Sequence, residues 1–211
     1  FTVDFTTTGL PASALTKRGF DLSYEHHGGN ALLVYSDGTS NPKYRTFNGA
    51  AWSDASSVFG TPPGSGAVEW IEVTSRLLTN EAALVYADAD RKLHAVIWNG
   101  ASWDEAHATT LDTNGEVTAN KFFDAQYEYS GDLLVAWGRL DTDGIAYSTK
   151  AAGASSWNTP AVYTFSYDSD SEIVDLAAEP GGDRIAVAHY SKDEDDVEAA
   201  MWDGAAFIDG K

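Results

Sequence analysis

The chain has 211 residues, of which 43% are hydrophobic, a composition that predicts a folded globular domain and excludes an intrinsically disordered chain. Thirty-two acidic residues against 13 basic ones give a net charge of −19, which argues against nucleic acid and anionic membranes as partners. The absence of cysteine excludes disulfides, and no apolar run approaches the ~18 residues that a membrane-spanning helix needs.

Residues 1–19 form an N-terminal segment with the pattern of a single strand. Apolar and polar side chains alternate from Phe1 to Phe5, which is the period of a strand with one buried face. We expect this segment to pair with the last repeat of the chain and complete it. The chain begins with Phe1 and not with Met, so we also expect a processed product or a fragment, and export from the cell.

Four copies of one unit, each about 50 residues long, account for the rest of the chain. We place them at residues 20–66, 67–119, 120–170 and 171–211. An apolar run recurs once in each unit, at residues 31–35, 82–86, 133–137 and 184–189. A second motif, Phe47-Asn48-Gly49-Ala50-Ala51-Trp52, recurs at 98–103 and 202–207, and its end recurs at 153–157. A fixed period of this length predicts a repeat architecture.

Each unit has the periodicity of short strands joined by tight turns. In the second unit we expect strands at Glu69–Val73, Ala82–Tyr86, Leu93–Trp98 and Trp103–Thr110. Asn99-Gly100 between the third and fourth strands predicts a type I′ hairpin turn, in which both residues have positive φ. The sequence therefore predicts an all-β fold with one four-stranded antiparallel sheet per unit.

Such sheets bury both faces when copies stack around an axis, as the blades of a β-propeller do. The apolar-Asn-Gly-x-x-Trp segment resembles the degenerate repeats of β-propeller proteins of bacterial and archaeal cell surfaces. This resemblance implies a β-propeller of four-stranded antiparallel blades. The four units make either a closed four-bladed propeller, similar in size to hemopexin-like domains, or a section of a larger array.

Aromatic residues recur at the expected start of the outer strand, at Trp52, Trp103, Trp157 and Phe207. They predict either platforms on which sugar rings stack or wedges that pack between adjacent blades. We align Trp137 with Ser36, Ala87 and His189, which gives it an individual role. The candidate ligand-binding residues are therefore Trp137, Trp52, Trp103 and Trp157.

The connection between the second and third strands is acidic in every unit. Closely spaced carboxylates in a turn can bind Ca²⁺, which needs six to eight oxygen ligands. The candidate metal ligands are Asp88, Asp90, Asp141 and Asp143. A solvated turn is the alternative, because Asp and Gly are also common turn residues. The overall acidity fits first of all a solubility role, and a halophilic source would also produce it.

No catalytic motif accompanies the repeats. The six arginines are scattered through the repeat frame, and the Ser-x-Asp-x-Gly-x-x-Trp box of sialidases is absent. We expect the histidines, among them His94 and His189, to serve in packing or in exposed turns.

We predict a non-catalytic extracellular or cell-surface module for ligand binding, adhesion, or assembly of a surface fibre or envelope. Its partners would be a glycan, a surface protein or further copies paired through edge strands, and not nucleic acid or the membrane interior. The alternatives are a sialidase-like enzyme with an axial carboxylate pair and a periplasmic or intracellular scaffold.

Overall fold

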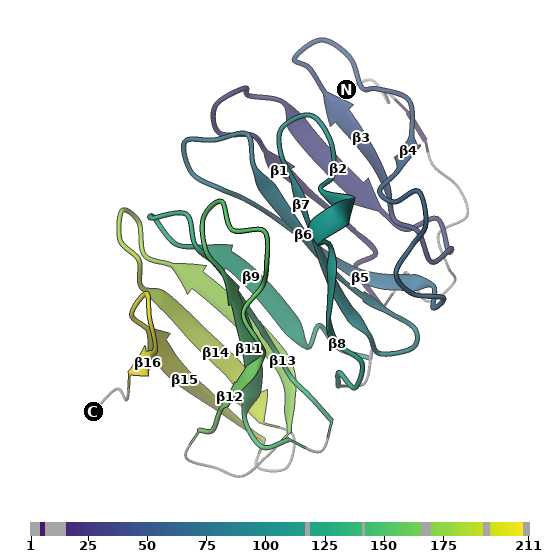
Figure 1. Cartoon of the computed structure of the whole chain (residues 1–211). Coiled ribbons are helices and arrows are strands. Elements are labelled where there is room, and N and C mark those ends of the chain that lie inside the picture. The colour runs from purple at the N-terminus through teal and green to yellow at the C-terminus, as the bar shows by residue number, and fades with distance from the viewer. Residues whose placement is uncertain are drawn as a thin grey trace. The chain divides into compact units, whose positions relative to one another are not determined.

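The computed structural model describes residues 5–6, 16–116, 119–140, 142–165, 170–191 and 195–208. Their strands form four sheets, each with four antiparallel strands in sequential order (Figure 1). The all-β prediction is confirmed. The chain divides into two compact units, Phe1–Thr110 and Leu111–Lys211, each of which contains two sheets. The predicted N-terminal strand falls mostly outside the described residues and stays a prediction.

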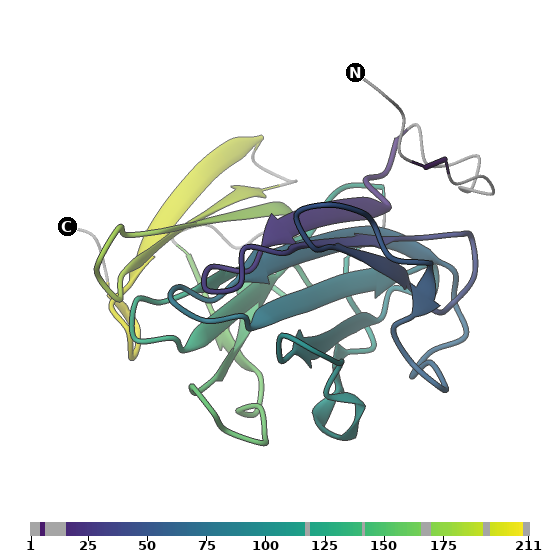
Figure 2. The same cartoon turned by 90° about the horizontal axis from the view of Figure 1, so that it is seen from above.

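Unit 1 contains sheets 1 and 2, apart from Leu111 and Asp112 at the end of sheet 2, which belong to unit 2. Sheet 1 consists of β1 (Phe20–Tyr24), β2 (Ala31–Tyr35), β3 (Lys43–Phe47) and β4 (Ser56–Ser57). Sheet 2 consists of β5 (Val68–Ser75), β6 (Ala82–Asp88), β7 (Leu93–Trp98) and β8 (Thr109–Asp112), with the short 3₁₀ helix η2 (Glu105–His107) before β8. The two sheets of this unit lie face to face (Figure 2).

Unit 2 contains sheets 3 and 4. Sheet 3 consists of β9 (Phe123–Tyr127), β10 (Leu133–Trp137), β11 (Ile145–Lys150) and β12 (Ala161–Tyr163). Sheet 4 consists of β13 (Ser171–Ala178), β14 (Ile185–Ser191), β15 (Asp196–Trp202) and β16 (Phe207–Ile208). No helix in the described part of the chain is long and apolar enough to cross a membrane.

Each unit has its own hydrophobic core between its two sheets. In unit 1, Leu32 and Val34 from β2 pack with Ile71 and Leu84 from sheet 2, and all four are buried. Leu134, Val174, Leu176 and Val187 belong to the corresponding core of unit 2. The alternating apolar residues of the edge strands β5 and β13 thus provide the face on which the preceding sheet packs.

The same hydrogen bond joins the two sheets in both units. A carboxylate on the first strand of one sheet accepts the backbone N–H of a residue on the first strand of the next. In unit 1, Asp21 Oδ2 accepts Val73 N at 2.8 Å. In unit 2, Asp124 Oδ2 accepts Leu176 N at 2.7 Å, and burial raises the pKa of Asp124 despite the neighbouring Lys121 ammonium. The acid fixes the register of one sheet against the next.

The Asn-Gly turns are not of type I′. Gly100 has φ 94°, but Asn99 is not among the described non-glycine residues with positive φ. The loop has four residues, because Trp98 bridges to Trp103, and the Asn99 Oδ1 atom accepts the N–H groups of Ala101 and Ser102 at 2.9 Å. The side-chain oxygen of the residue before the glycine is therefore needed to accept two backbone hydrogen bonds. The equivalent loops at 48–51 and 203–206 have the same bonds.

The recurrent aromatic residues mostly precede the outer strands and do not begin them. Trp52 makes an isolated bridge to Phe47, and the outer strand β4 starts only at Ser56. Trp103 likewise lies before η2 and β8, so the predicted strand Trp103–Thr110 is wrong over most of its length. Of the recurrent aromatics, Phe207 does begin an outer strand, β16.

Trp137 occupies a regular position of the repeat. It lies opposite Phe123, as Tyr35 lies opposite Phe20 and Tyr86 opposite Ile71. The predicted alignment of Trp137 with Ser36 and Ala87 is therefore wrong by one residue. A one-residue shift exchanges the two faces of a strand. In the observed register Trp137 takes the same position as Tyr35 and Tyr86, so the alignment no longer supports an individual role for it.

Candidate functional site

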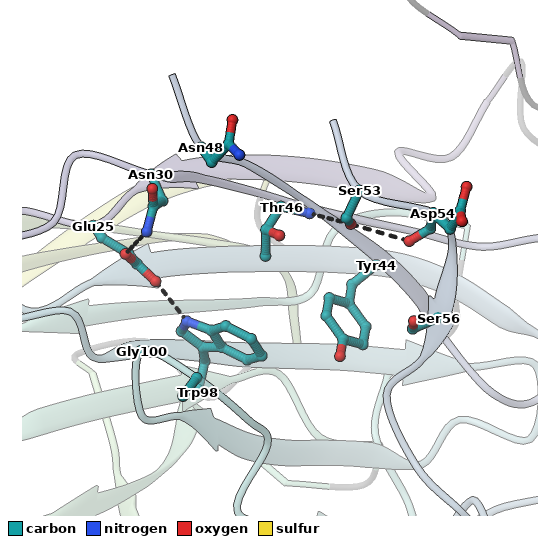
Figure 3. A pocket seen from close by; sticks show the side chains of 11 residues that line it. Glu25, Asn30, Tyr44, Thr46, Asn48, Ser53, Asp54, Ser56, Trp98 and Gly100 are labelled. Carbon is teal, nitrogen blue, oxygen red and sulfur yellow. Dashed lines mark hydrogen bonds between the residues drawn. The ribbon is translucent and has the colours of Figure 1, made fainter. Parts of the chain in front are cut away.

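A pocket of about 460 Å³ is lined by both sheets of unit 1 (Figure 3). Sheet 1 contributes the β1–β2 loop, β3, the loop after β3 and the start of β4, and sheet 2 contributes the end of β7 and the turn that follows. The lining residues are Glu25, Asn30, Tyr44, Thr46, Asn48, Ser53, Asp54, Ser56, Trp98, Gly100 and Ala101. This volume is in the range of small-molecule sites in proteins.

A buried carboxylate fixes the inner wall of the pocket. Glu25 is 3% exposed, and its Oε1 atom accepts the indole N–H of Trp98 at 2.8 Å. Its Oε2 atom accepts the side-chain amide of Asn30 at 2.8 Å. Both oxygens thus have a donor, which a buried charged group requires. The Glu25 side chain holds Trp98 of sheet 2 in place from sheet 1.

Aromatic rings form the apolar side of the pocket. The Tyr44 ring lies 5.5 Å from the Trp98 ring, centroid to centroid, and 5.7 Å from the Trp103 ring. Figure 3 shows Tyr44 next to Trp98, with the Glu25 carboxylate reaching the indole nitrogen. Because Trp98 is 4% exposed and Tyr44 is half-buried, the rings are rigidly held and present only part of their surface to a ligand.

Polar groups form the outer rim. Asn48 and Asp54 are exposed, and Thr46 is half-buried on β3. Asn48 uses its Oδ1 atom within its own turn, so its Nδ2 group is the part of the amide left to donate. Asp54 supplies carboxylate acceptors and Thr46 a hydroxyl. A partly exposed aromatic wall beside a rim of donors and acceptors suits a small polyhydroxylated ligand.

Unit 2 repeats the inner wall of this site. Glu128 is 3% exposed and accepts the indole N–H of Trp202 at 2.6 Å, and Tyr147 packs on both Trp202 and Phe207. Burial raises the pKa of Glu128, and hydrogen bonds from Trp202 and Ser130 only partly oppose it. Glu25 and Glu128 were not among the predicted site residues, although Tyr24-Glu25 recurs as Tyr127-Glu128 two repeats later.

The structure places the predicted aromatic residues in packing positions, and their role in ligand binding stays untested. Trp137 is fully buried and donates its indole N–H to Asp112 Oδ2 at 2.8 Å. Trp103 is 8% exposed and packs edge-on against Trp98. Trp52 packs between Phe5 and Phe47. Trp157 is half-buried, and its indole nitrogen has no hydrogen-bond partner among the described residues. Of the predicted positions, Trp103 contacts two lining residues of the pocket, Tyr44 and Trp98.

The predicted metal ligands do not form a cluster in the described part of the chain. There, no group of three His, Asp or Glu side chains could hold a metal ion. Asp88 is buried, and its Oδ1 atom accepts hydrogen bonds from the backbone N–H groups of Asp90 and Lys92. Its Oδ2 atom is hydrogen-bonded to His94 Nε2. Although burial raises the pKa of Asp88, its hydrogen bonds with His94 and Lys92 bring it below the ordinary value. Asp141 lies outside the described residues, so the Asp141–Asp143 half of this prediction is untested.

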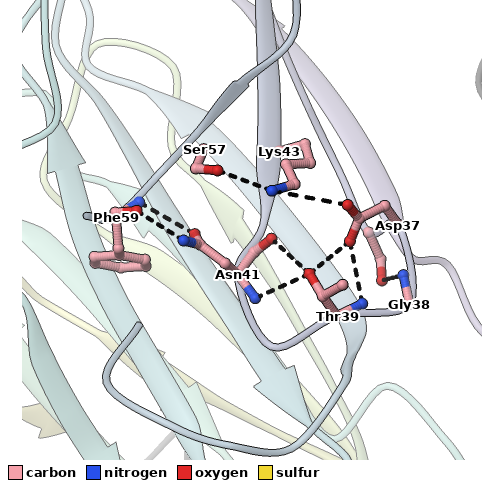
Figure 4. Close-up of polar contacts among 8 residues, drawn as sticks. Asp37, Gly38, Thr39, Asn41, Lys43, Ser57 and Phe59 are labelled. Carbon is pink, nitrogen blue, oxygen red and sulfur yellow. Dashed lines mark hydrogen bonds and ion pairs between the residues drawn. The ribbon is translucent and has the colours of Figure 1, made fainter. Parts of the chain in front are cut away.

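Another acidic loop shows how such carboxylates are used. Asp37 follows β2, and its Oδ1 atom accepts both the N–H and the hydroxyl of Thr39, at 3.1 and 2.6 Å (Figure 4). Lys43 lies 3.8 Å from the other oxygen. The Asn41 side chain donates from Nδ2 to the Phe59 carbonyl oxygen and accepts the Phe59 N–H at Oδ1. In this loop the carboxylate organises a turn.

Sheet 4 contains a Ser–His–Glu arrangement that the sequence analysis did not detect. Ser171 Oγ lies 2.7 Å from His189 Nδ1, and His189 Nε2 lies 3.4 Å from Glu198 Oε2. However, Ser171 is fully buried, the Phe165 ring lies 3.9 Å from the imidazole, and the hydroxyl also donates to the Gly144 carbonyl. With no solvent access to the hydroxyl, this cluster is a packing element, as expected for His189.

Comparisons with known proteins relate the chain to β-propeller lectins through its fold. No protein-family model and no curated protein matches the chain. Among solved structures, the BP39L lectin from Burkholderia pseudomallei is similar with a TM-score of 0.66 at 13% identity, over 91% of this chain and 54% of that one. The Aleuria aurantia lectin, a six-bladed β-propeller with a novel mode of fucose recognition, has a TM-score of 0.57 at 16% identity, over 86% and 56% of the two chains.

A sialidase shares the same fold. NanB from Streptococcus pneumoniae has a TM-score of 0.55 at 10% identity, over 81% of this chain and 27% of that one. Identities this low show the fold alone. The chain spans just over half the length of the first two lectins. The all-β chain of four antiparallel sheets therefore has the fold of the propeller lectins.

Proposed function

We propose that the chain is a carbohydrate-binding, lectin-like module that holds one sugar residue in the unit 1 pocket. The observation that carries this proposal is the wall of Tyr44 and Trp98, locked by the buried Glu25 and faced by a polar rim. The apolar face of a sugar ring packs on such rings, while its hydroxyls exchange hydrogen bonds with the rim. The fold shared with lectins supports the same assignment.

The test is binding of simple saccharides, measured by calorimetry. One similar lectin, SapL1, was solved in complex with α-methyl fucoside, so this glycoside is the first probe and a panel of other monosaccharides follows. Each titration is run with calcium and with a chelator, since the predicted calcium site is untested. We expect binding that one pocket variant abolishes.

The pocket variant is Ala101→Trp, which places a large ring in the pocket from an exposed turn. Its matched control is Ala50→Trp, at the same position of the equivalent turn in sheet 1, whose residue does not line the pocket. Loss of binding in Ala101→Trp alone supports the site. Equal binding by both variants would place the sugar elsewhere, and no binding by the unmodified chain would overturn the lectin proposal.

Presentation outside the cell and a role in adhesion belong to the same proposal. A glycan-binding module acts where glycans are displayed, and the excess of negative charge keeps such a module from adsorbing to anionic surfaces. Immunolabelling of intact cells of the source tests the location. The sialidase-like alternative stays a hypothesis, and release of sialic acid from a fluorogenic sialoside by the purified chain tests it.

A further inference from the structure

Every sheet of this fold has two faces of different kinds. We call the face that carries Phe20 in sheet 1, and the equivalent residue of each other sheet, the front face. The back face is the opposite one, which carries Asp21 in sheet 1. In each unit, the back face of the first sheet packs on the front face of the second, as the hydrogen bonds from Asp21 to Val73 and from Asp124 to Leu176 show.

The front face of sheet 1 is exposed where its equivalent is buried. Phe20 is 51% exposed, whereas Ile71 at the same position of sheet 2, in the same unit, is 0% exposed. Leu22 and Tyr24, the next residues on this face, are also exposed. β1 therefore presents three large apolar side chains to solvent along the edge strand of its sheet, a surface that a stable monomer seldom leaves uncovered.

The back face of sheet 4 is exposed in the same way. Val197 is 71% exposed, whereas Ile145 at the same position of sheet 3, in the same unit, is 0% exposed. Beside larger residues such as Ile173, Tyr190 and Met201, the rest of this face includes four alanines, at positions 177, 186, 188 and 199. Sheet 1 thus exposes a front face and sheet 4 a back face, which are the two kinds of surface that pack together within each unit.

The two exposed faces are complementary in shape. In units 1 and 2, a third-strand tyrosine of the back face fills the space beside an aromatic pair of the next sheet: Tyr44 against Trp98 and Trp103, and Tyr147 against Trp202 and Phe207. In sheet 1 this aromatic pair is Phe47 and Trp52, and Phe5 already packs on Trp52 at 5.5 Å. Sheet 4 has the small Ala199 at the tyrosine position, so its back face leaves room for Phe5.

The faces also complement each other in hydrogen bonding. Asp175 is exposed on the back face of sheet 4, at the position of Asp21 and Asp124. Those two acids accept the N–H groups of Val73 and Leu176, and Leu22 occupies that position in sheet 1. An Asp175 carboxylate placed over β1 would therefore accept the Leu22 N–H by the geometry already used in each unit.

We propose that the front face of sheet 1 binds the back face of sheet 4 of a second copy of this chain, head to tail. The contact goes beyond sugar binding and does not depend on it. A heterologous contact of this kind closes into a ring or extends into a fibre.

The test measures the mass of the full chain in solution by analytical ultracentrifugation over a range of concentrations. The protomer mass is 22.6 kDa, so oligomers are well separated from it. We expect the unmodified chain to associate, and Leu22→Glu and Val197→Glu each to abolish association. Both side chains are exposed, so neither change disturbs a core. Leu78→Glu, at an exposed leucine in the β5–β6 turn, is the matched control and should associate normally.

Mixing the two variants separates this proposal from other contacts. Leu22→Glu keeps an intact back face and Val197→Glu an intact front face, so an equimolar mixture should form a dimer and nothing larger. Asp175→Ala should weaken association about tenfold, as the loss of one charge-assisted hydrogen bond does. A monomeric unmodified chain would overturn the proposal and leave these faces to further sheets of a longer protein. Self-association of either variant alone, or no association in the mixture, would also overturn it.

Discussion

The hydrogen bond between Trp98 and Glu25 can be tested as the link between the fold and the pocket. Trp98→Phe keeps an aromatic ring but removes the N–H that Glu25 Oε1 accepts at 2.8 Å. Because Glu25 is 3% exposed, the carboxylate oxygen loses its donor in a place that water hardly reaches. We expect the free energy of unfolding to fall by about 2 kcal/mol, the usual cost of leaving such a group without a partner.

The size of the effect is isolated by a double-mutant cycle. Glu25→Ala leaves the Trp98 N–H without an acceptor and should also cost about 2 kcal/mol. When both groups are removed, neither is left unsatisfied, so the double variant should lose about 2 kcal/mol less than the sum of the single variants. Urea unfolding, followed by tryptophan fluorescence and by circular dichroism, measures the three differences. Additivity within about 0.5 kcal/mol would show that the Trp98 N–H and the Glu25 carboxylate do not stabilise each other.

Unit 2 supplies the internal control for binding. The pair Trp202 and Glu128 has the same geometry at 2.6 Å, so the cycle of Trp202→Phe and Glu128→Ala should show a similar coupling. Its variants should bind sugar in the unit 1 pocket normally, whereas Trp98→Phe should bind it more weakly. Because burial raises the pKa of Glu128, the coupling should also weaken as acidification protonates this carboxylate.

Three further outcomes follow from single contacts. Burial lowers the pKa of His189, so this side chain takes up a proton more readily in the unfolded chain than in the folded one as the pH falls below about 6.5. Thermal melting should therefore show a loss of stability on acidification, and His189→Gln should lack this loss. Identical pH profiles of the two proteins would contradict the prediction. Asn99→Ala removes the acceptor of two turn N–H groups and should cost about 1 kcal/mol by urea unfolding, whereas Asn99→Asp should be nearly neutral. A Cβ on Gly138 would lie 1.7 Å from the Ser171 carbonyl oxygen, so Gly138→Ala should abolish folding as judged by circular dichroism, while Gly60→Ala, with its nearest neighbour at 3.7 Å, should fold normally.

The sequence was sufficient to predict the sheets because local signals agree with one another. Apolar residues, alternating in β5 and nearly continuous in β6 and β7, mark strands within a residue or two of the observed ends. The outer strands were predicted poorly, since β4 has only two residues, Ser56 and Ser57, and no apolar pattern. Their place is set by pairing with β3 and not by their own side chains.

The inner wall of the pocket could not be predicted in the same way. Glu25 and Trp98 are separated by 73 positions, and a glutamate in a loop gives no sign that it is buried. Trp103 and Trp52 were predicted to bind a ligand because they recur. Recurrence marks packing as readily as binding, and both side chains pack against neighbouring aromatic rings in the structure. Only the paired recurrence of Tyr-Glu at 24–25 and 127–128 was available as a signal.

Asp21 and Asp124 hold neighbouring sheets together, because each carboxylate accepts a hydrogen bond from a backbone N–H of the next sheet. Such a bond places no demand on the side chain of the residue that donates it, and valine serves in one unit and leucine in the other. Mutations can therefore change most of the donor strand while the sheets keep their alignment. A fold joined in this way can drift far in sequence, which is consistent with lectins of the same architecture sharing so few residues with this chain.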